Sequence, residues 1–254
     1  MNVFTYDKTF EGLLTSVFEA YERKLFPDVL LAEQEPLPLF YNEVINVITD
    51  EVKSNRVWRG LQKKLSPAGQ SVLTTAWLSE LPEIDILLFR YMRKAIDASQ
   101  SIELNFGDPD VLQASQIAKK VSQERMRVIQ FLRFQKAADG TFFAALEPLY
   151  NVLPIAIGHF QDRFADQNWL IYDLKREYGY FYDQAQVTEV RFETRTAHLL
   201  TGKLNPQLMD EDEQLFQRLW KEYFKSISIK ARKNPKLHRQ NLPARFWKYL
   251  PEKN

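Results

Sequence analysis

The chain has 254 residues, of which 45% are hydrophobic and 13% aromatic, enough to bury one large core or two smaller ones. It contains no cysteine, which excludes disulfides, thiolate catalysts and cysteine-ligated iron–sulfur clusters. The net charge of +1 hides an asymmetry, because ten Lys and Arg oppose two Glu over residues 221–254. This C-terminal segment carries +8 and residues 1–220 carry −7, which favours a polyanionic partner.

Several classes of protein are excluded by patterns that the sequence lacks. It has no apolar run of about 18 residues, and the opening MNVFTYDKTFEG is not a signal peptide, so we expect a cytoplasmic protein without a membrane partner. The eight glycines are isolated, which rules out phosphate-binding loops and dinucleotide fingerprints. GxSxG and HExxH motifs are absent as well. We therefore expect no cofactor and no bound metal.

The first 126 residues read as mostly helical. Residues 2–7 predict a short strand, and Asp7 or Thr9 is expected to cap the helix that follows. Apolar side chains recur there at helical spacing: Phe10, Leu13, Leu14, Val17, Phe18, Tyr21 and Leu25. Helical patterns continue over 41–99, with breaks near 65–67 and 81–82, and a new helix starts after the turn at 107–110.

The pattern changes after residue 126. Two β-rich runs flank Asp139 and Gly140, a strong hairpin signal. Residues 151–165 return to helical spacing, and 168–193 predict two or three strands with breaks at Gly179 and near 184–186. We expect an α+β fold, with helices packed around an antiparallel sheet, in a single domain over 1–254. Its helical half covers about 1–126, and its sheet-rich, basic half covers about 127–254.

A last amphipathic helix is expected from Asp210, with Glu213 three residues on in a capping-box arrangement. Its expected core face consists of Leu215, Phe216, Leu219, Trp220, Tyr223, Phe224 and Ile227. Lys221 and Lys225 suit its C-terminal end, where the helix dipole favours positive charge.

The basic tail is the first candidate site. Its expected nucleic-acid-binding residues are Lys230, Arg232, Lys233, Lys236, Arg239, Arg245 and Lys248, because several cations on one surface neutralise phosphates. A tail packed on the acidic remainder of the chain is the alternative. We expect Phe246 and Trp247 to anchor the tail to the core while its cations point outward, although an exposed Trp247 could instead stack on a base.

A second cluster offers weak catalytic candidates. His159 and Arg163 share a helix face, and Asp173, Lys175 and Glu177 alternate along an expected strand. These charges form either a polar pocket or an exposed network of ion pairs. Asp173 and Lys175 also have the spacing of a nuclease half-motif, in which a carboxylate holds Mg²⁺. Such a site needs a further carboxylate, with Asp162 and Asp166 as candidates.

A third cluster surrounds the first expected hairpin strand: Arg125, Arg127, Arg133 and Lys136, interleaved with Phe131 and Phe134. It could extend a nucleic-acid-binding face. A strand that alternates core and solvent sides gives the same pattern.

Three segments resemble a bacterial family described as "probable DNA metabolism protein": FTYDKTFEGLLTSVFEAYERK, FLRFQKAADGTFFAALEPLYNVLPIAIGHFQDRFADQNWLIYDLKREYG and FQRLWKEYFKSISIKARKNPKLHRQNLPARFWKYLPE. Members of that family are encoded beside a radical-SAM protein of DNA modification or repair. Some relatives are fused to a uracil-DNA-glycosylase-like domain. We expect no second domain with that activity in this chain. The resemblance implies a DNA-related role and a radical-SAM partner, and it supplies no catalytic residues.

These observations lead to one leading expectation and two alternatives. We expect a DNA-metabolism accessory protein that binds DNA through its basic C-terminal segment and works with a radical-SAM repair or modification enzyme. One alternative is a metal-dependent nuclease-like enzyme centred on Asp173 and Lys175. The other is a protein–protein adaptor whose tail docks on an acidic partner.

Overall fold

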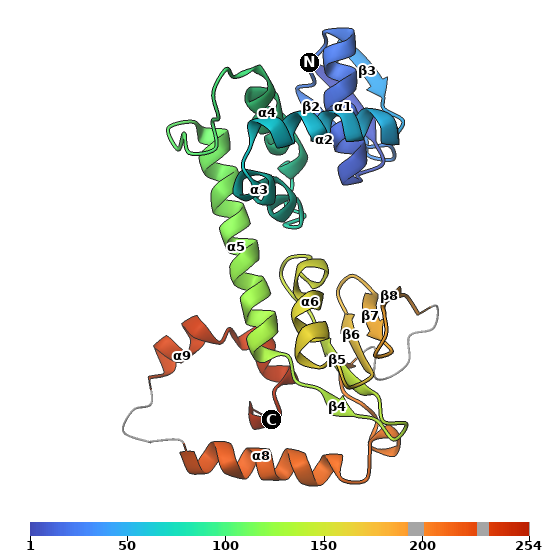
Figure 1. Ribbon diagram of the computed structural model, residues 1–254, viewed down its shortest axis with the longest axis vertical. Coiled ribbons are helices and arrows are strands. Elements are labelled where there is room, and N and C mark those ends of the chain that lie inside the picture. The colour runs from blue at the N-terminus through green and yellow to red at the C-terminus, as the bar shows by residue number, and fades with distance from the viewer. Residues whose placement is uncertain (193–200, 228–233, 254) are drawn as a thin grey trace. The chain divides into compact units, whose positions relative to one another are not determined.

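The computed structural model describes residues 1–192, 201–227 and 234–253, and divides into two compact units at residues 1–122 and 123–254 (Figure 1). Both units contain helices and strands, and the first is mostly helical, which confirms the α+β class. The prediction that 1–254 folds as one domain concerns folding cooperativity and stays a prediction. None of the described helices is long and apolar enough to cross a membrane.

The first unit contains a three-stranded parallel sheet in the order β2-β1-β3. Its central strand is the predicted one, β1 (Asn2–Tyr6), which pairs with β2 (Val29–Ala32) and β3 (Glu43–Asn46). The helical pattern expected from residue 41 was wrong at β3. Four residues with one buried apolar side chain, Ile45, show too little periodicity to separate a strand from a helix.

The cap of the first helix and the breaks between the later helices of the first unit lie where the sequence predicts them. Helix α1 (Phe10–Arg23) is capped by Thr9, whose hydroxyl accepts from the N–H of Gly12. The breaks near 65–67 and 81–82 separate α2 (Glu51–Lys64), α3 (Pro67–Trp77) and α4 (Ile84–Asp97). Phe10 packs against the rings of Trp58 and Trp77, so aromatic contacts join α1 to α2 and α3.

Helix α5 (Pro109–Phe131) starts at the predicted proline and crosses residue 122, so its last turns belong to the second unit. It runs five residues past Met126, where a strand was expected. Strand β4 (Gln135–Lys136) is therefore only two residues long. The predicted hairpin is present, because β4 pairs antiparallel with β5 (Phe142–Leu146) across a turn in which Gly140 has a φ of 86°.

The second unit is built on a five-stranded sheet in the order β4-β5-β6-β7-β8. Strand β6 (Trp169–Asp173) pairs in parallel with β5, and β7 (Tyr178–Tyr182) and β8 (Val187–Val190) continue antiparallel. The expectation of an antiparallel sheet thus fails at β5 and β6. Helix α6 (Leu153–Arg163) provides the crossover that a parallel pair requires (Figure 1).

Gly179 lies inside β7, so the break predicted there was wrong. A side chain at this position would place its Cβ 2.3 Å from the carbonyl oxygen of Ile171 on β6. The glycine is therefore explained by the close approach of two strands. The actual break is the turn at 174–177, which follows Asp173, and the turn predicted near 184–186 is present between β7 and β8.

The described residues after 201 contain a series of helices and short non-helical stretches. These helices are η1 (Pro206–Leu208), α8 (Glu213–Ile227), α9 (Pro235–Asn241), η3 (Ala244–Tyr249) and η4 (Pro251–Lys253). The expected capping box at α8 is not formed, because the Glu213 carboxylate accepts from the N–H of Lys136 on β4, at 3.1 Å. Asp210 instead pairs with the Lys136 ammonium group, at 2.9 Å.

Candidate functional site

The C-terminal segment is anchored to the second unit by apolar side chains. Phe246 is 3% exposed and packs against the ring of Phe131 at the end of α5, with ring centroids 5.8 Å apart. Leu242 and Leu250 are buried on either side of it. Trp247 is half-buried, and its indole N–H donates to the carbonyl oxygen of Leu242, at 3.1 Å. Anchoring by both adjacent aromatics was predicted, and Phe246 provides the buried contact.

An ion pair adds to this anchoring. The Arg245 guanidinium binds both carboxylate oxygens of Glu124, a side chain that is only 1% exposed. The same carboxylate accepts from the backbone N–H of Leu149, at 2.9 Å, and lies 3.3 Å from Arg127 Nη1. Arg245 thus compensates a buried negative charge on α5.

The predicted tail cations fall into three groups. Lys230, Arg232 and Lys233 lie outside the described residues. Arg245 and Lys248 are paired with carboxylates, since Lys248 Nζ lies 2.8 Å from Glu147 Oε2. Lys236 and Arg239 on α9 are exposed, and neither forms an ion pair with a described residue. The expectation that the tail's cations point outward therefore fails at Arg245.

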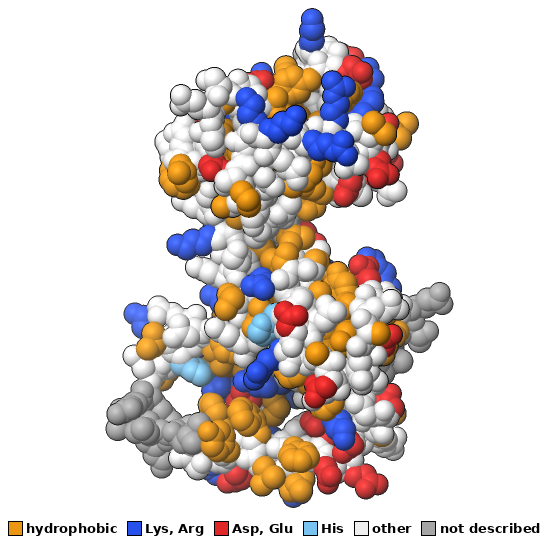
Figure 2. Space-filling view, in the orientation of Figure 1, with side chains coloured by type: hydrophobic (Ala, Val, Ile, Leu, Met, Phe, Trp, Pro, Cys, Tyr) orange, Lys and Arg blue, Asp and Glu red, His pale blue; other side chains and the backbone are white. Residues whose placement is uncertain are grey.

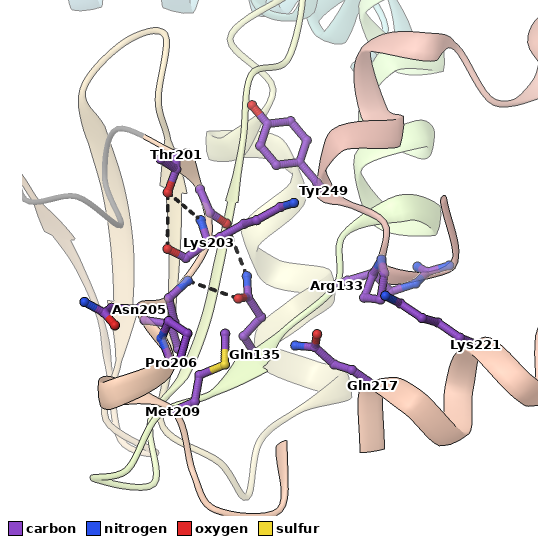
Figure 3. Close-up of a pocket in the computed structure, with 13 residues that line it drawn as sticks. Arg133, Gln135, Thr201, Lys203, Asn205, Pro206, Met209, Gln217, Lys221 and Tyr249 are labelled. Atoms are coloured by element: carbon purple, nitrogen blue, oxygen red, sulfur yellow. Dashed lines mark hydrogen bonds between the residues drawn. The ribbon is translucent and has the colours of Figure 1, made fainter. Parts of the chain in front are cut away.

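A pocket of about 580 Å³ lies beside the anchored segment (Figure 3). We call it the cationic pocket. Its walls come from β4, from the segment that leads into α8, from α8 itself and from the last helical turns. The lining residues are Arg133, Gln135, Thr201, Gly202, Lys203, Leu204, Asn205, Pro206, Met209, Gln217, Lys221, Tyr249 and Pro251.

Gln135 holds one wall of the cationic pocket in place. Its side-chain N–H donates to the carbonyl oxygen of Gly202, at 3.2 Å, and its side-chain oxygen accepts from the N–H of Leu204, at 3.0 Å. Both hydrogen bonds are buried, so the position of Lys203 between these two residues is set by β4. Burial raises the pKa of Tyr249 to about 12, so this wall residue adds no negative charge to the pocket.

The charge that lines the cationic pocket is positive. Lys203 and Lys221 approach it from different elements, and neither ammonium group forms an ion pair with a described residue (Figure 3). Arg133 is held differently, because its Nη2 donates to Glu252 Oε1, at 3.0 Å. None of the described residues that line the pocket carries a carboxyl group. Such a pocket favours an anion.

A second hollow, of about 890 Å³, lies against α8, and we call it the aromatic hollow. Its lining residues are Arg133, Phe134, Arg163, Phe164, Glu213, Phe216, Gln217, Leu219, Trp220, Tyr223 and Pro251. The predicted core face of α8 is wrong here, since Phe216 is 62% and Tyr223 55% exposed. Figure 2 shows hydrophobic side chains gathered on the surface over α8.

The second predicted cluster is not brought together. Asp173 is the last residue of β6, so Lys175 and Glu177 lie in the following turn and not on one side of a strand. Arg163 is exposed and lines the aromatic hollow, and His159 is exposed on the same helix. No interaction joins Asp173 to either of them in the described part of the chain.

Asp173 has a structural position. Its side chain is 0% exposed, and its oxygens accept from the N–H groups of Lys175 and Arg176 and from Arg176 Nη1, at 2.9 to 3.1 Å. Burial raises the pKa of Asp173 above its ordinary value, and the Arg176 guanidinium offsets part of that effect. The carboxylate therefore closes the turn after β6.

Addition of Mg²⁺ or Mn²⁺ is expected to cause no DNA cleavage that depends on Asp173, because the protein's own donors already occupy its oxygens. In residues 1–192, 201–227 and 234–253, no three His, Asp or Glu side chains are grouped to hold a metal. Gel assays with labelled DNA can compare the unmodified protein with Asp173→Asn and with Lys175→Ala, whose side chain is exposed. Cleavage by the unmodified protein that is lost in Asp173→Asn, at unchanged melting temperature, would contradict this expectation.

Some of the lining residues were candidates from the sequence and others were not. Arg133, which lines both cavities, and Arg163, which lines the aromatic hollow, were candidates. Lys203, Gln217 and the role of Lys221 in the cationic pocket were not predicted. Lys203 is a single lysine in TGKLNP, a stretch without a charge pattern. The apolar residues of α8 have the same spacing as those of a helix face that packs on a core. Only the structure therefore distinguishes this exposed apolar face from a buried one.

The fold and the two cavities define an α+β protein of two compact units, the second of which carries a cationic pocket beside an aromatic hollow. The chain belongs to the DUF4130 family, a domain of unknown function whose family model matches residues 82–252. The comparison with curated proteins gave no significant match.

Among solved structures, the pGpG-specific phosphodiesterase PggH from Vibrio cholerae is similar to the chain at 12% sequence identity. The match covers 71% of this chain and 81% of that one, with a TM-score of 0.39. A similarity this low carries no argument about the activity of this chain.

Proposed function

We propose that the chain is an accessory protein of DNA metabolism, and that it binds DNA phosphates through its basic C-terminal segment and the cationic pocket. One observation carries the proposal: Lys203 and Lys221 line a pocket whose described walls carry no carboxyl group. Lys221, Tyr249 and Pro251 come from the C-terminal segment itself. The segment with the charge excess thus provides part of the pocket.

Anchoring of the C-terminal segment supports the proposal. A cation on an ordered surface loses less conformational entropy on binding than one on a free tail. Phe246 and the pair of Arg245 with Glu124 fix the segment, and Lys236 and Arg239 remain exposed to a phosphate backbone. Arg245 then serves DNA binding by holding the segment in place.

The partner in this proposal is a radical-SAM enzyme of DNA repair or modification. Its support is the resemblance to the family described as "probable DNA metabolism protein", whose members are encoded beside such an enzyme. A chain without cysteine cannot supply the ligands of an iron–sulfur cluster, so the cluster would belong to the partner.

The variant Lys203→Ala/Lys221→Ala is expected to weaken DNA binding and to reduce its salt dependence. The slope of log K against log salt falls by about 1 for each phosphate that is no longer neutralised, so the double variant should lower it by about 2. Fluorescence anisotropy with a labelled oligonucleotide, between low and moderate salt, measures both the affinity and the slope.

Lys63→Ala/Lys120→Ala is a matched control, since both lysines are exposed in the first unit and the charge change is the same. This control should bind DNA as the unmodified protein does at every salt concentration. Equal losses in the two double variants would show that net charge alone attracts DNA. That result would remove the cationic pocket from the proposal.

A further inference from the structure

The aromatic hollow and the cationic pocket are neighbours. Both are lined by Arg133, Gln217 and Pro251, which therefore stand between them. Glu252 fixes this shared wall, because its carboxylate accepts from Arg133 Nη2 and from Trp220 Nε1, each at 3.0 Å. A ligand that occupies both cavities would meet aromatic faces on one side and ammonium groups on the other.

The aromatic hollow is an exposed apolar surface of the second unit. Trp220 and Tyr223 lie on the same face of α8, with ring centroids 5.7 Å apart and an interplanar angle of 36°. Both rings are at least 40% exposed, as is Phe216 one turn earlier. A contiguous apolar patch on a protein surface usually marks a binding site.

The charge of the aromatic hollow limits what can occupy it. Arg163 is exposed there and forms no ion pair with a described residue. The carboxylate in the lining, Glu213, already accepts from the N–H of Lys136 and from the side chain of Gln217. The hollow therefore offers aromatic faces and an available guanidinium, which complement a flat ring attached to an anion.

We propose that the aromatic hollow binds an unpaired base of single-stranded DNA while the adjoining phosphate enters the cationic pocket. The inference rests on the proposed function, to which it adds a preference for unpaired DNA. Every base has a π-face, so stacking on Trp220 and Tyr223 would tolerate any sequence. A paired base inside a duplex keeps its faces stacked on its neighbours and cannot enter.

Tyr223→Ala is expected to weaken single-strand binding about tenfold, the usual effect of losing one stacking partner. Binding to a duplex of the same length should change less than twofold. Anisotropy with an oligonucleotide, alone and annealed to its complement, gives both values. Tyr223→Phe keeps the ring and should bind like the unmodified protein. Leu215→Ala tests the same helix outside the hollow, and should also have no effect.

The possible outcomes separate the two proposals. Equal losses for single strand and duplex would overturn this inference and leave the proposed function standing. No binding of either DNA by the unmodified protein would overturn both. If light scattering shows a dimer that dissociates in Tyr223→Ala, a second copy of the chain covers the hollow and the inference is wrong.

Discussion

Phe246→Ala is expected to lower the free energy of unfolding of the second unit by about 3 to 5 kcal/mol, the usual cost of removing a buried phenylalanine ring. Phe246 is 3% exposed and packs on Phe131, so its loss leaves a cavity between η3 and α5. Amide hydrogen exchange along β5 and β6 measures this free energy for the second unit.

Trp247→Ala is the matched comparison for Phe246→Ala. Trp247 is half-buried, so less apolar area returns to water and the expected loss of stability is smaller. Limited proteolysis should cut the C-terminal segment faster in Phe246→Ala than in Trp247→Ala. The reverse order would contradict the assignment of Phe246 as the main anchor.

Arg245→Ala is expected to destabilise the second unit by about 2 to 3 kcal/mol, because the buried Glu124 carboxylate loses its main charged partner. Arg127 and the N–H of Leu149 remain, so the loss stays below that of a fully unpaired buried charge. Amide hydrogen exchange in the second unit, recorded at increasing urea concentrations, measures this loss of stability.

A second substitution tests this account of Arg245. Glu124→Gln removes the buried charge, so Arg245→Ala/Glu124→Gln should be more stable than Arg245→Ala alone. Lys248→Ala breaks a surface pair with Glu147 and should cost less than about 1 kcal/mol. If Glu124→Gln restores no stability in the Arg245→Ala background, the buried pair does not anchor the segment.

Local patterns predicted the local elements of this fold. Thr9 caps α1, Pro109 begins α5, and Gly140 turns the β4–β5 hairpin, as expected from residues within a few positions of each. The misses have physical causes as well. Gly179 was predicted to be a break because a glycine in a strand pattern often marks a turn. Its close approach to the backbone of Ile171 on β6 is visible only in the structure.

The site was less predictable, because its parts meet only through contacts between distant residues. Arg133 and Glu252 are 119 positions apart, and Glu124 and Arg245 are 121 apart. No local pattern reveals that Arg245 is neutralised by a buried carboxylate while Lys221 is not. The composition shows the charge excess of the C-terminal segment. It does not show which of these cations pair with a carboxylate and which do not.

The shared wall of the two cavities has a consequence for protein synthesis. Domains fold as the chain leaves the ribosome, and β4 to β8 emerge well before Pro251 and Glu252. Until those two residues are made, Arg133 and Trp220 lack the carboxylate that joins them. A nascent chain that has not yet reached Pro251 would therefore carry the sheet without the shared wall of the two cavities.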